Sequence, residues 1–369
     1  MTQVPKLSRR SRWAIPAGAL VVTGGVLAGT LISSAQAAPG LPARTAAQLL
    51  AEVADSTTPP LTGTVVETAS FGLPALPATG NPTSLSSLLT GSHTIRVWYA
   101  SPQHFRLAVP QSLSESDVIR DGRTAWLWQS TLNKVTKFTL PAKSAAKAVV
   151  PRQPLTPQQA AKQVLAAVGP TTTVRVDSNV TVAGQAAYAL VLAPKDARSL
   201  VGQVQIDVDG SNGVPLRLQV FARGASSPAF QVGYTDIHFV RPAAADLSFT
   251  PPAGATVTQV NLSDSHPGGA MDHATPGVTT TGSGWLTVLE LPSAALTPGA
   301  SGAGGPSAGD STAVLRTVLA AATPVHGTWG SGRLLRTSLV SVLITDQGPT
   351  FIGAVQPSVL YAAAAAHPH

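Results

Sequence analysis

One stretch of the chain, from Ser92 to Leu140, restricts the fold more than any other, because turn-forming residues interrupt it at short intervals. The apolar run that ends at Tyr99 is followed by Ala100-Ser101-Pro102-Gln103, where the proline fixes φ and stops a central strand. Further along, Asp121-Gly122 is typical of tight hairpins because it tolerates positive φ. Asn133-Lys134 allows another reversal. The sequence therefore predicts an antiparallel meander.

Large aromatic side chains lie along this meander. Trp126 and Trp128 are two residues apart, so on a strand they project from the same face. Trp98 and Phe105 lie on the strands before them. Aromatic residues on successive strands of one sheet form either the floor of an apolar groove or a core covered by a helix. Both interpretations require a curved sheet with one apolar face.

Four segments of the chain resemble, in the same order, the LolA-like lipoprotein-carrier superfamily. The first two are VWYASPQHFRLAV and ESDVIRDGRTAWLW, a strand ending in Trp and a Pro, then a hairpin of the form Asp-Gly-x-x-x-Trp. The third is QIDVDGSNGVPLRLQVF (Gln205–Phe221), and the fourth is LSFTPPAGATV (Leu247–Val257). Together these segments extend the resemblance over roughly Thr45 to Val257.

The resemblance implies an α+β fold in which a strongly curved antiparallel β-sheet, a half-barrel, is covered by helices. Two segments fit such helices, Ala43–Ser56 and Thr156–Val168, the second with Thr156 as its cap and Gly169 beyond its end. A small C-terminal α+β domain follows, and this two-part layout resembles the RseB/MucB family of envelope-stress regulators. The expected organisation is a signal peptide at 1–37, the half-barrel at 38–262, a linker at 263–284 and the C-terminal domain at 285–366.

A half-barrel closed by helices leaves an apolar cavity, and the resemblance implies that its ligand is the acyl chain of a lipid or lipoprotein. Each buried CH₂ contributes roughly 0.8 kcal/mol, so such a chain binds without polar contacts. The residues expected to line the cavity are Trp98, Phe105, Leu107, Trp126, Trp128, Phe138, Leu190, Leu218 and Phe230, with Arg106 at the rim. For each of them, packing in an ordinary core is the alternative. In the carriers a functional Arg precedes the strand-end Pro; here Ser101 takes that position, which puts cargo transfer in doubt.

The N-terminus has the features of an export signal. Its basic residues are Lys6, Arg9, Arg10 and Arg12. An apolar segment, Trp13–Ile32, follows, and Ala35-Gln36-Ala37 fits a small-x-small cleavage site. We therefore expect an extracytoplasmic protein, either cleaved here or anchored in the membrane by residues 13–32. The chain of 369 residues contains no Cys, which excludes a thioether-linked lipid and disulfide bonds.

Charge and motifs argue against several classes of function. The formal net charge of +7 falls to +3 without the four basic residues of the N-terminal segment, and no stripe of Lys and Arg alternates with aromatic residues, so nucleic acid is not expected as a partner. Gly305-Pro306-Ser307-Ala308-Gly309 spells a nucleophile elbow but lies in a low-complexity run. Asp264, His266, Asp272 and His273 have irregular spacing in a Gly/Pro-rich segment.

We therefore expect a binding protein with no enzymatic activity, metal or cofactor. The alternative to a lipid or lipoprotein carrier is a regulator that binds the extracytoplasmic part of a membrane protein such as an anti-sigma factor. A third interpretation, a hydrolase, has no positive support in the motifs.

Overall fold

A computed structural model describes residues 40–72, 90–111, 113–141, 156–166, 169–262, 278–292 and 320–366. All of these residues belong to one compact unit, Ala38–His369. The predicted export signal and its apolar segment lie outside the described residues. Within the described residues, no helix combines the length and the apolar character needed to cross a membrane.

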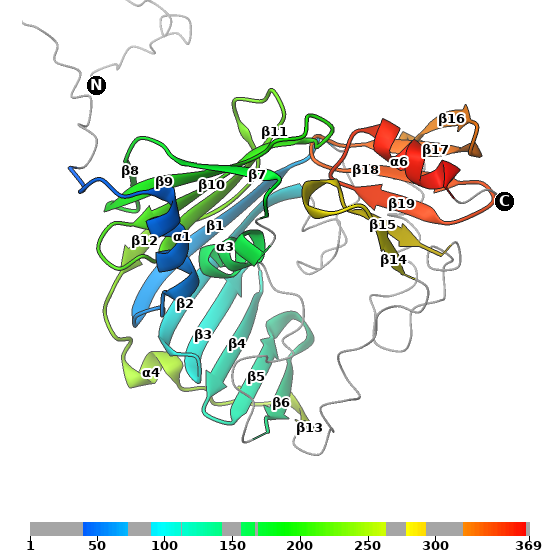
Figure 1. The fold of residues 1–369 in the computed structure, drawn as a ribbon. Coiled ribbons are helices and arrows are strands. Elements are labelled where there is room, and N and C mark those ends of the chain that lie inside the picture. The colour runs from blue at the N-terminus through cyan, green and yellow to red at the C-terminus, as the bar shows by residue number, and fades with distance from the viewer. Residues whose placement is uncertain are drawn as a thin grey trace, which may run out of the picture. The chain divides into compact units, whose positions relative to one another are not determined.

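Among the described residues, 13 strands form one open sheet in the order β13-β6-β5-β4-β3-β2-β1-β12-β11-β10-β9-β7, with β8 paired to β9 (Figure 1). The strands are β1 Leu61–Ser70, β2 Thr90–Ser101, β3 His104–Pro110, β4 Glu115–Asp121, β5 Thr124–Gln129, β6 Lys134–Thr139, β7 Thr172–Val176, β8 Val180–Val182, β9 Gln185–Pro194, β10 Val201–Asp209, β11 Pro215–Ala222, β12 Pro228–His238 and β13 Thr256–Asn261. The predicted large curved sheet is confirmed, but it is mixed, because β13 runs parallel to β6.

The predicted meander is confirmed from β2 to β6, where each strand pairs antiparallel with the next. Gly122 has a φ of 60° between β4 and β5, and its N–H donates to the Gln103 carbonyl at 2.9 Å. A short 3-10 helix, η1 (Ser130–Leu132), precedes β6, and Asn133 ends it with a φ of 44°. Local turn chemistry therefore sets the register of this half of the sheet.

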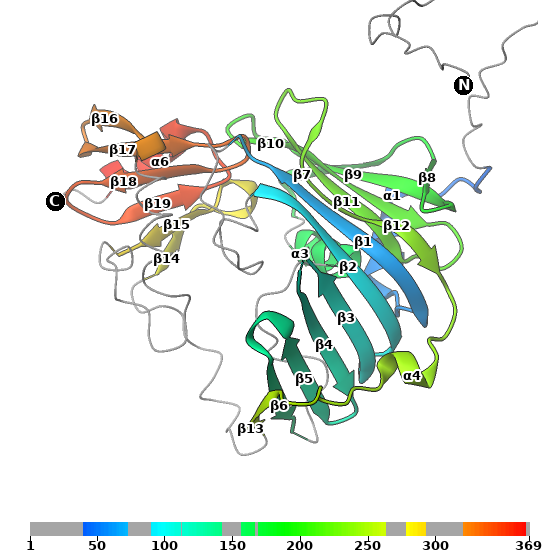
Figure 2. The same cartoon turned by 180° about the vertical axis from the view of Figure 1, so that it is seen from behind.

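Two helices lie against one face of the sheet, and the strands curve around them (Figures 1 and 2). Helix α1 (Ala46–Asp55) begins with a capping box between Thr45 and Gln48, and it buries Leu49 and Val53. Helix α3 (Pro157–Ala166) buries Ala160 and Ala161 in the same core. Strands β9 to β12, β1 and β2 contribute most of the remaining apolar side chains of that core, as expected for helices packed on a sheet.

The segment between β12 and β13 follows the sheet to its far edge. It contains α4 (Ala244–Leu247), which contacts β3 and β4. Phe249 then meets the indole of Trp126 with 5.6 Å between ring centroids. Asn133 Nδ2 donates to the Gly254 carbonyl at 2.9 Å, which holds the chain just before β13.

A second sheet of six described strands has the order β14-β15-β19-β18-β17-β16 and a core of its own. Its elements are β14 Thr279–Thr281, the 3-10 helix η2 Gly284–Leu286, β15 Val288–Leu291, β16 Thr323–Gly327, β17 Gly330–Arg336, β18 Ser341–Thr345, β19 Thr350–Gly353 and α6 Pro357–Ala365. Strand β14 lies within the predicted linker, of which residues 263–277 are outside the described part; the domain boundaries stay a prediction.

The apolar-rich stretch from Arg333 to Thr345 is not one continuous strand. A turn at Thr337–Val340 divides it into β17 and β18. The N–H of Thr337 donates to the Val340 carbonyl at 2.9 Å, and the Thr337 hydroxyl accepts from the N–H of Val340 at 2.9 Å. These bonds close the turn locally, so the strand cannot continue.

Candidate functional site

The register of the strands assigns every side chain of the large sheet to one of two faces. Paired residues project from the same face, and neighbours along a strand project from opposite faces. We call the face that packs against α1 and α3 the inner face; it carries Leu61 and Val65 of β1. Leu61 pairs with Tyr99, and Tyr99 pairs with Phe105, so these rings are also on the inner face.

Six of the predicted lining residues share this inner face. They are Phe105, Leu107, Phe138, Leu190, Leu218 and Phe230. Leu127 also belongs to it, because it pairs with Val118 and Thr136. Leu127 and Tyr99 are not among the predicted lining residues. The available signal for Leu127 was its place between two residues that share the opposite face.

The three tryptophans and Arg106 lie on the other side, which we call the outer face, so the prediction that they line or rim the same surface is wrong. Trp98 pairs with Arg106, Arg106 with Ile119, and Ile119 with Trp126. Trp126 and Trp128 do share a face, as predicted. The strand register places that face on the opposite side of the sheet from Phe105. The inner face of β4 instead carries Arg120, whose Nε donates to the Gly122 carbonyl at 3.2 Å.

Beneath the helices the inner face is a packed core. Leu190 is 0% exposed and Leu218 is 2% exposed. The Nε2 of Gln158, on α3, donates to the Tyr234 hydroxyl at 3.0 Å and fixes the helix on β12. Burial raises the pKa of Tyr234 to about 12. Leu190 and Leu218 therefore pack as core residues here, the alternative left open by the sequence.

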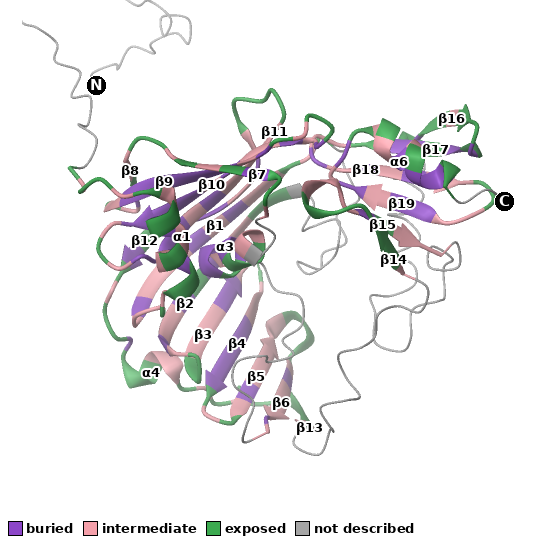
Figure 3. Ribbon diagram, viewed as in Figure 1, coloured by how far each residue is buried: buried purple, intermediate pink, exposed green. Residues whose placement is uncertain are grey.

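Beyond the helices, the inner face carries partly exposed apolar side chains on β2, β3, β5 and β6. We call Tyr99, Phe105, Leu107, Leu127 and Phe138 the apolar strip. Figure 3 shows the difference: β9 and β10 are mainly buried, whereas β3 and β5 are largely of intermediate exposure. The apolar strip continues the core surface without the same degree of burial, which is typical of a surface that receives a ligand.

On the outer face of the meander, charged side chains contact the aromatic rings and one another. The Arg106 guanidinium lies over the Trp98 ring, 5.4 Å from its centroid, and pairs with Asp117 and with Glu115. The Lys137 ammonium lies 5.0 Å from the centroid of the Trp126 ring. These contacts occupy the faces of both indoles, so the outer face does not offer a continuous apolar surface.

Asp117 should make the stability of the fold depend on pH. Its side chain is 1% exposed, and burial raises its pKa to about 7 although Arg106 opposes the shift. Because this folded-state pKa lies above the ordinary value of 3.8, the contribution of Asp117 to stability is full below about pH 4 and is lost as the pH rises through 7.

We expect the unfolding free energy measured in urea to fall between about pH 4 and pH 8, by on the order of a few kcal/mol. The Asp117→Asn variant, which cannot ionise, should lack this part of the decline. If both proteins show the same pH profile, Asp117 is ionised throughout the range.

Ser101, at the position of the carriers' functional Arg, has a local role. Its hydroxyl lies 3.0 Å from His104 Nδ1 and accepts from the N–H of Gln103 at 3.3 Å. It therefore stabilises the turn between β2 and β3.

The described residues contain no group of three or more His, Cys, Asp or Glu placed to hold a metal ion. The sequence from Asp264 to His273 and the Gly305–Gly309 motif both lie outside the described part of the chain.

Comparison with known proteins gives structural neighbours only. No protein-family model and no curated protein matches the chain. A chain of the Pseudomonas aeruginosa MucA/MucB complex aligns with 16% identity and a TM-score of 0.43, covering 86% of this chain and 96% of that one. A LolA superfamily protein from Nitrosomonas europaea aligns with 13% identity and a TM-score of 0.22, covering 56% and 99%.

A putative outer membrane lipoprotein-sorting protein domain from Vibrio parahaemolyticus aligns with 10% identity and a TM-score of 0.19, covering 52% of this chain and 90% of that domain. Scores this low leave the function to the geometry of the site. The solved structures similar to this chain thus include a chain of the MucA/MucB complex and a LolA superfamily protein.

Proposed function

We propose that the apolar strip binds the acyl chain of a lipid or lipoprotein, and that the protein acts as a carrier or chaperone of such molecules rather than as an enzyme. The observation that carries this proposal is the partial exposure of Tyr99, Phe105, Leu107, Leu127 and Phe138 along one face of a curved sheet. The export features of residues 1–37 support an extracytoplasmic site of action.

The size of the hydrophobic effect sets the ligand length. Association costs roughly 4–15 kcal/mol in lost freedom, and each buried CH₂ returns roughly 0.8 kcal/mol. About ten buried methylene groups are therefore the least that gives measurable affinity. Short acids and free headgroups should not bind.

Saturated fatty acids of about eight to about eighteen carbons, competing with a fluorescent fatty acid for the purified protein, test this proposal. We expect the dissociation constant to fall roughly fourfold for each added CH₂ until the strip is filled. A dissociation constant that ignores chain length, or the absence of any binding, contradicts the proposal.

One observation favours a second candidate, regulation through a membrane-protein partner such as an anti-sigma factor. Among the described residues β13 pairs only with β6, and its side chains are mostly exposed. An extended peptide can add to such an edge by main-chain hydrogen bonds. If the protein binds no fatty acid, this second candidate becomes the better supported function.

A further inference from the structure

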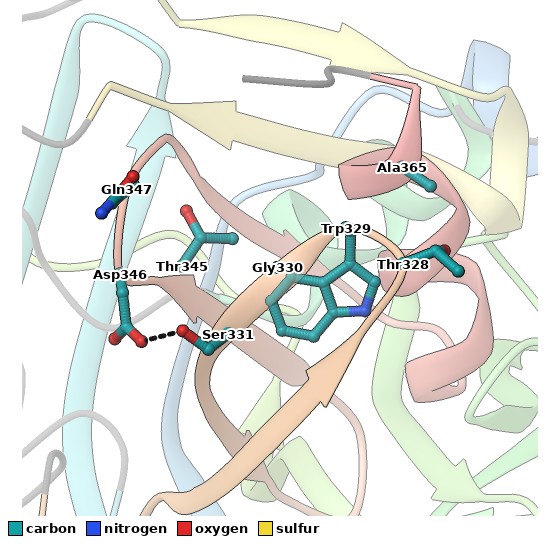
Figure 4. A pocket seen from close by; sticks show the side chains of 8 residues that line it. All are labelled: Thr328, Trp329, Gly330, Ser331, Thr345, Asp346, Gln347 and Ala365. Atoms are coloured by element: carbon teal, nitrogen blue, oxygen red, sulfur yellow. Dashed lines mark hydrogen bonds between the residues drawn. The ribbon is translucent and has the colours of Figure 1, made fainter.

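A cavity of about 370 Å³ lies in the six-stranded sheet, away from the apolar strip. Its lining comes from three places: the turn between β16 and β17 with the start of β17, the end of β18 with the turn after it, and the last turn of α6. Figure 4 shows the Trp329 indole between the other lining side chains, with Ser331 and Asp346 on one side in that view and Thr328 and Ala365 on the other. The volume is at the lower end of the range for small-ligand sites.

The indole is held in place by the fold. Trp329 stacks on Tyr361 of α6, with 5.6 Å between ring centroids and 13° between planes, and only 8% of the residue is exposed. Gly327 leaves room for it, because a Cβ at that position would lie 2.7 Å from Trp329 Nε1. The aromatic base of the cavity is therefore rigid before any ligand arrives.

The polar groups around the indole are also fixed. The Ser331 hydroxyl donates to Asp346 Oδ2 at 2.5 Å, and the N–H of Asp346 donates to the Ser331 carbonyl at 3.0 Å. The Thr345 hydroxyl donates to the Pro349 carbonyl at 2.9 Å. Asp346 and Gln347 are exposed, so their remaining acceptor and donor positions face solvent.

The chemistry of the lining selects one class of ligand. No Lys, Arg or His is among the described residues that line the cavity, which disfavours an anion. Hydroxyls, a carboxylate and a carboxamide suit a ligand with several hydroxyl groups. A sugar ring presents such hydroxyls at its edge and C–H groups on its faces, and the small exposed part of the Trp329 side chain offers those C–H groups an apolar contact.

We propose that this cavity is a saccharide-binding site, with Trp329 as the apolar base and Asp346 and Gln347 as hydrogen-bonding partners of the ring hydroxyls. The chain would then recognise a neutral sugar at this cavity in addition to the ligand of the apolar strip. It does not depend on the acyl-chain proposal, because the residues that carry the two are on different sheets.

Saturation-transfer NMR on the full chain, with glucose, mannose, N-acetylglucosamine and cellobiose as probes, tests the site. We expect at least one of them to bind. In the Asp346→Asn variant binding should weaken about tenfold, because a hydrogen bond to a charged group is lost while the amide oxygen still accepts from Ser331. Gln347→Ala should weaken it as well. Asp55→Asn, at an exposed position on α1, is the matched control and should bind as the unaltered chain does.

Trp329→Ala is a poor first test, because this residue belongs to the core of the second sheet. Saturation transfer to none of the four sugars overturns the proposal, as does sugar binding that survives both Asp346→Asn and Gln347→Ala. Tetramethylammonium is included as a further probe: if it binds in place of the sugars, the cavity recognises a cation through the indole and the carboxylate, and the saccharide proposal is wrong.

Discussion

Replacing Leu127 by Asp should weaken fatty-acid binding at least about 100-fold, whereas the same replacement at Trp128 should leave it within about threefold. The two residues are neighbours on β5, and both are partly exposed. The register sets Leu127 on the inner face and Trp128 on the outer face. An aspartate at 127 must lose its hydration water when an acyl chain covers the apolar strip. Desolvating an unpaired carboxylate costs much free energy, so binding is weakened.

Displacement of a fluorescent fatty acid measures the effect, and thermal unfolding of both variants shows whether each is folded. The pair is its own control, since the introduced residue, the strand and the exposure class are matched. If Trp128→Asp abolishes binding and Leu127→Asp does not, the ligand lies on the outer face with the indoles.

Replacing Leu190 by Ala should lower the unfolding free energy by about 2–5 kcal/mol. Leu190 is 0% exposed beneath the helices, so the truncation leaves a hole that the surrounding core fills only in part. Urea denaturation measures the loss. Leu132→Ala is the matched control: Leu132 is 64% exposed, and its truncation should change stability by less than about 0.5 kcal/mol.

The outcome also separates two roles for Leu190. A residue that lines a ligand cavity can be truncated at little cost to the empty protein, while binding suffers. Little loss of stability together with weaker fatty-acid binding would return Leu190 to the set of lining residues.

The meander could be predicted because its determinants are local. Pro102, Gly122 and Asn133 each place a turn through their own backbone preferences, and all three turns are present. The choice of inner and outer face could not be predicted in the same way. That choice depends on the pairing of β2 with β1, whose Leu61 and Val65 pack in the core that α1 and α3 share.

Two further features depended on contacts that sequence pattern does not encode. The break at Thr337 results from hydrogen bonds that the threonine makes with Val340, in a stretch whose hydropathy suits one continuous strand. The core positions of Leu190 and Leu218 depend on where the helices lie, which is a matter of tertiary packing.

The parallel pairing of β13 with β6 has a consequence for how the chain is made. Strand β6 ends at Thr139, and its outer neighbour begins only at Thr256. At a synthesis rate of about 5–20 residues per second, the roughly 120 intervening residues take about 6–24 s to emerge. During that interval β6 is an edge strand, and the main-chain N–H and C=O groups on its outer side have no strand partner. The growing polypeptide is therefore most prone to aggregation before β13 has been made.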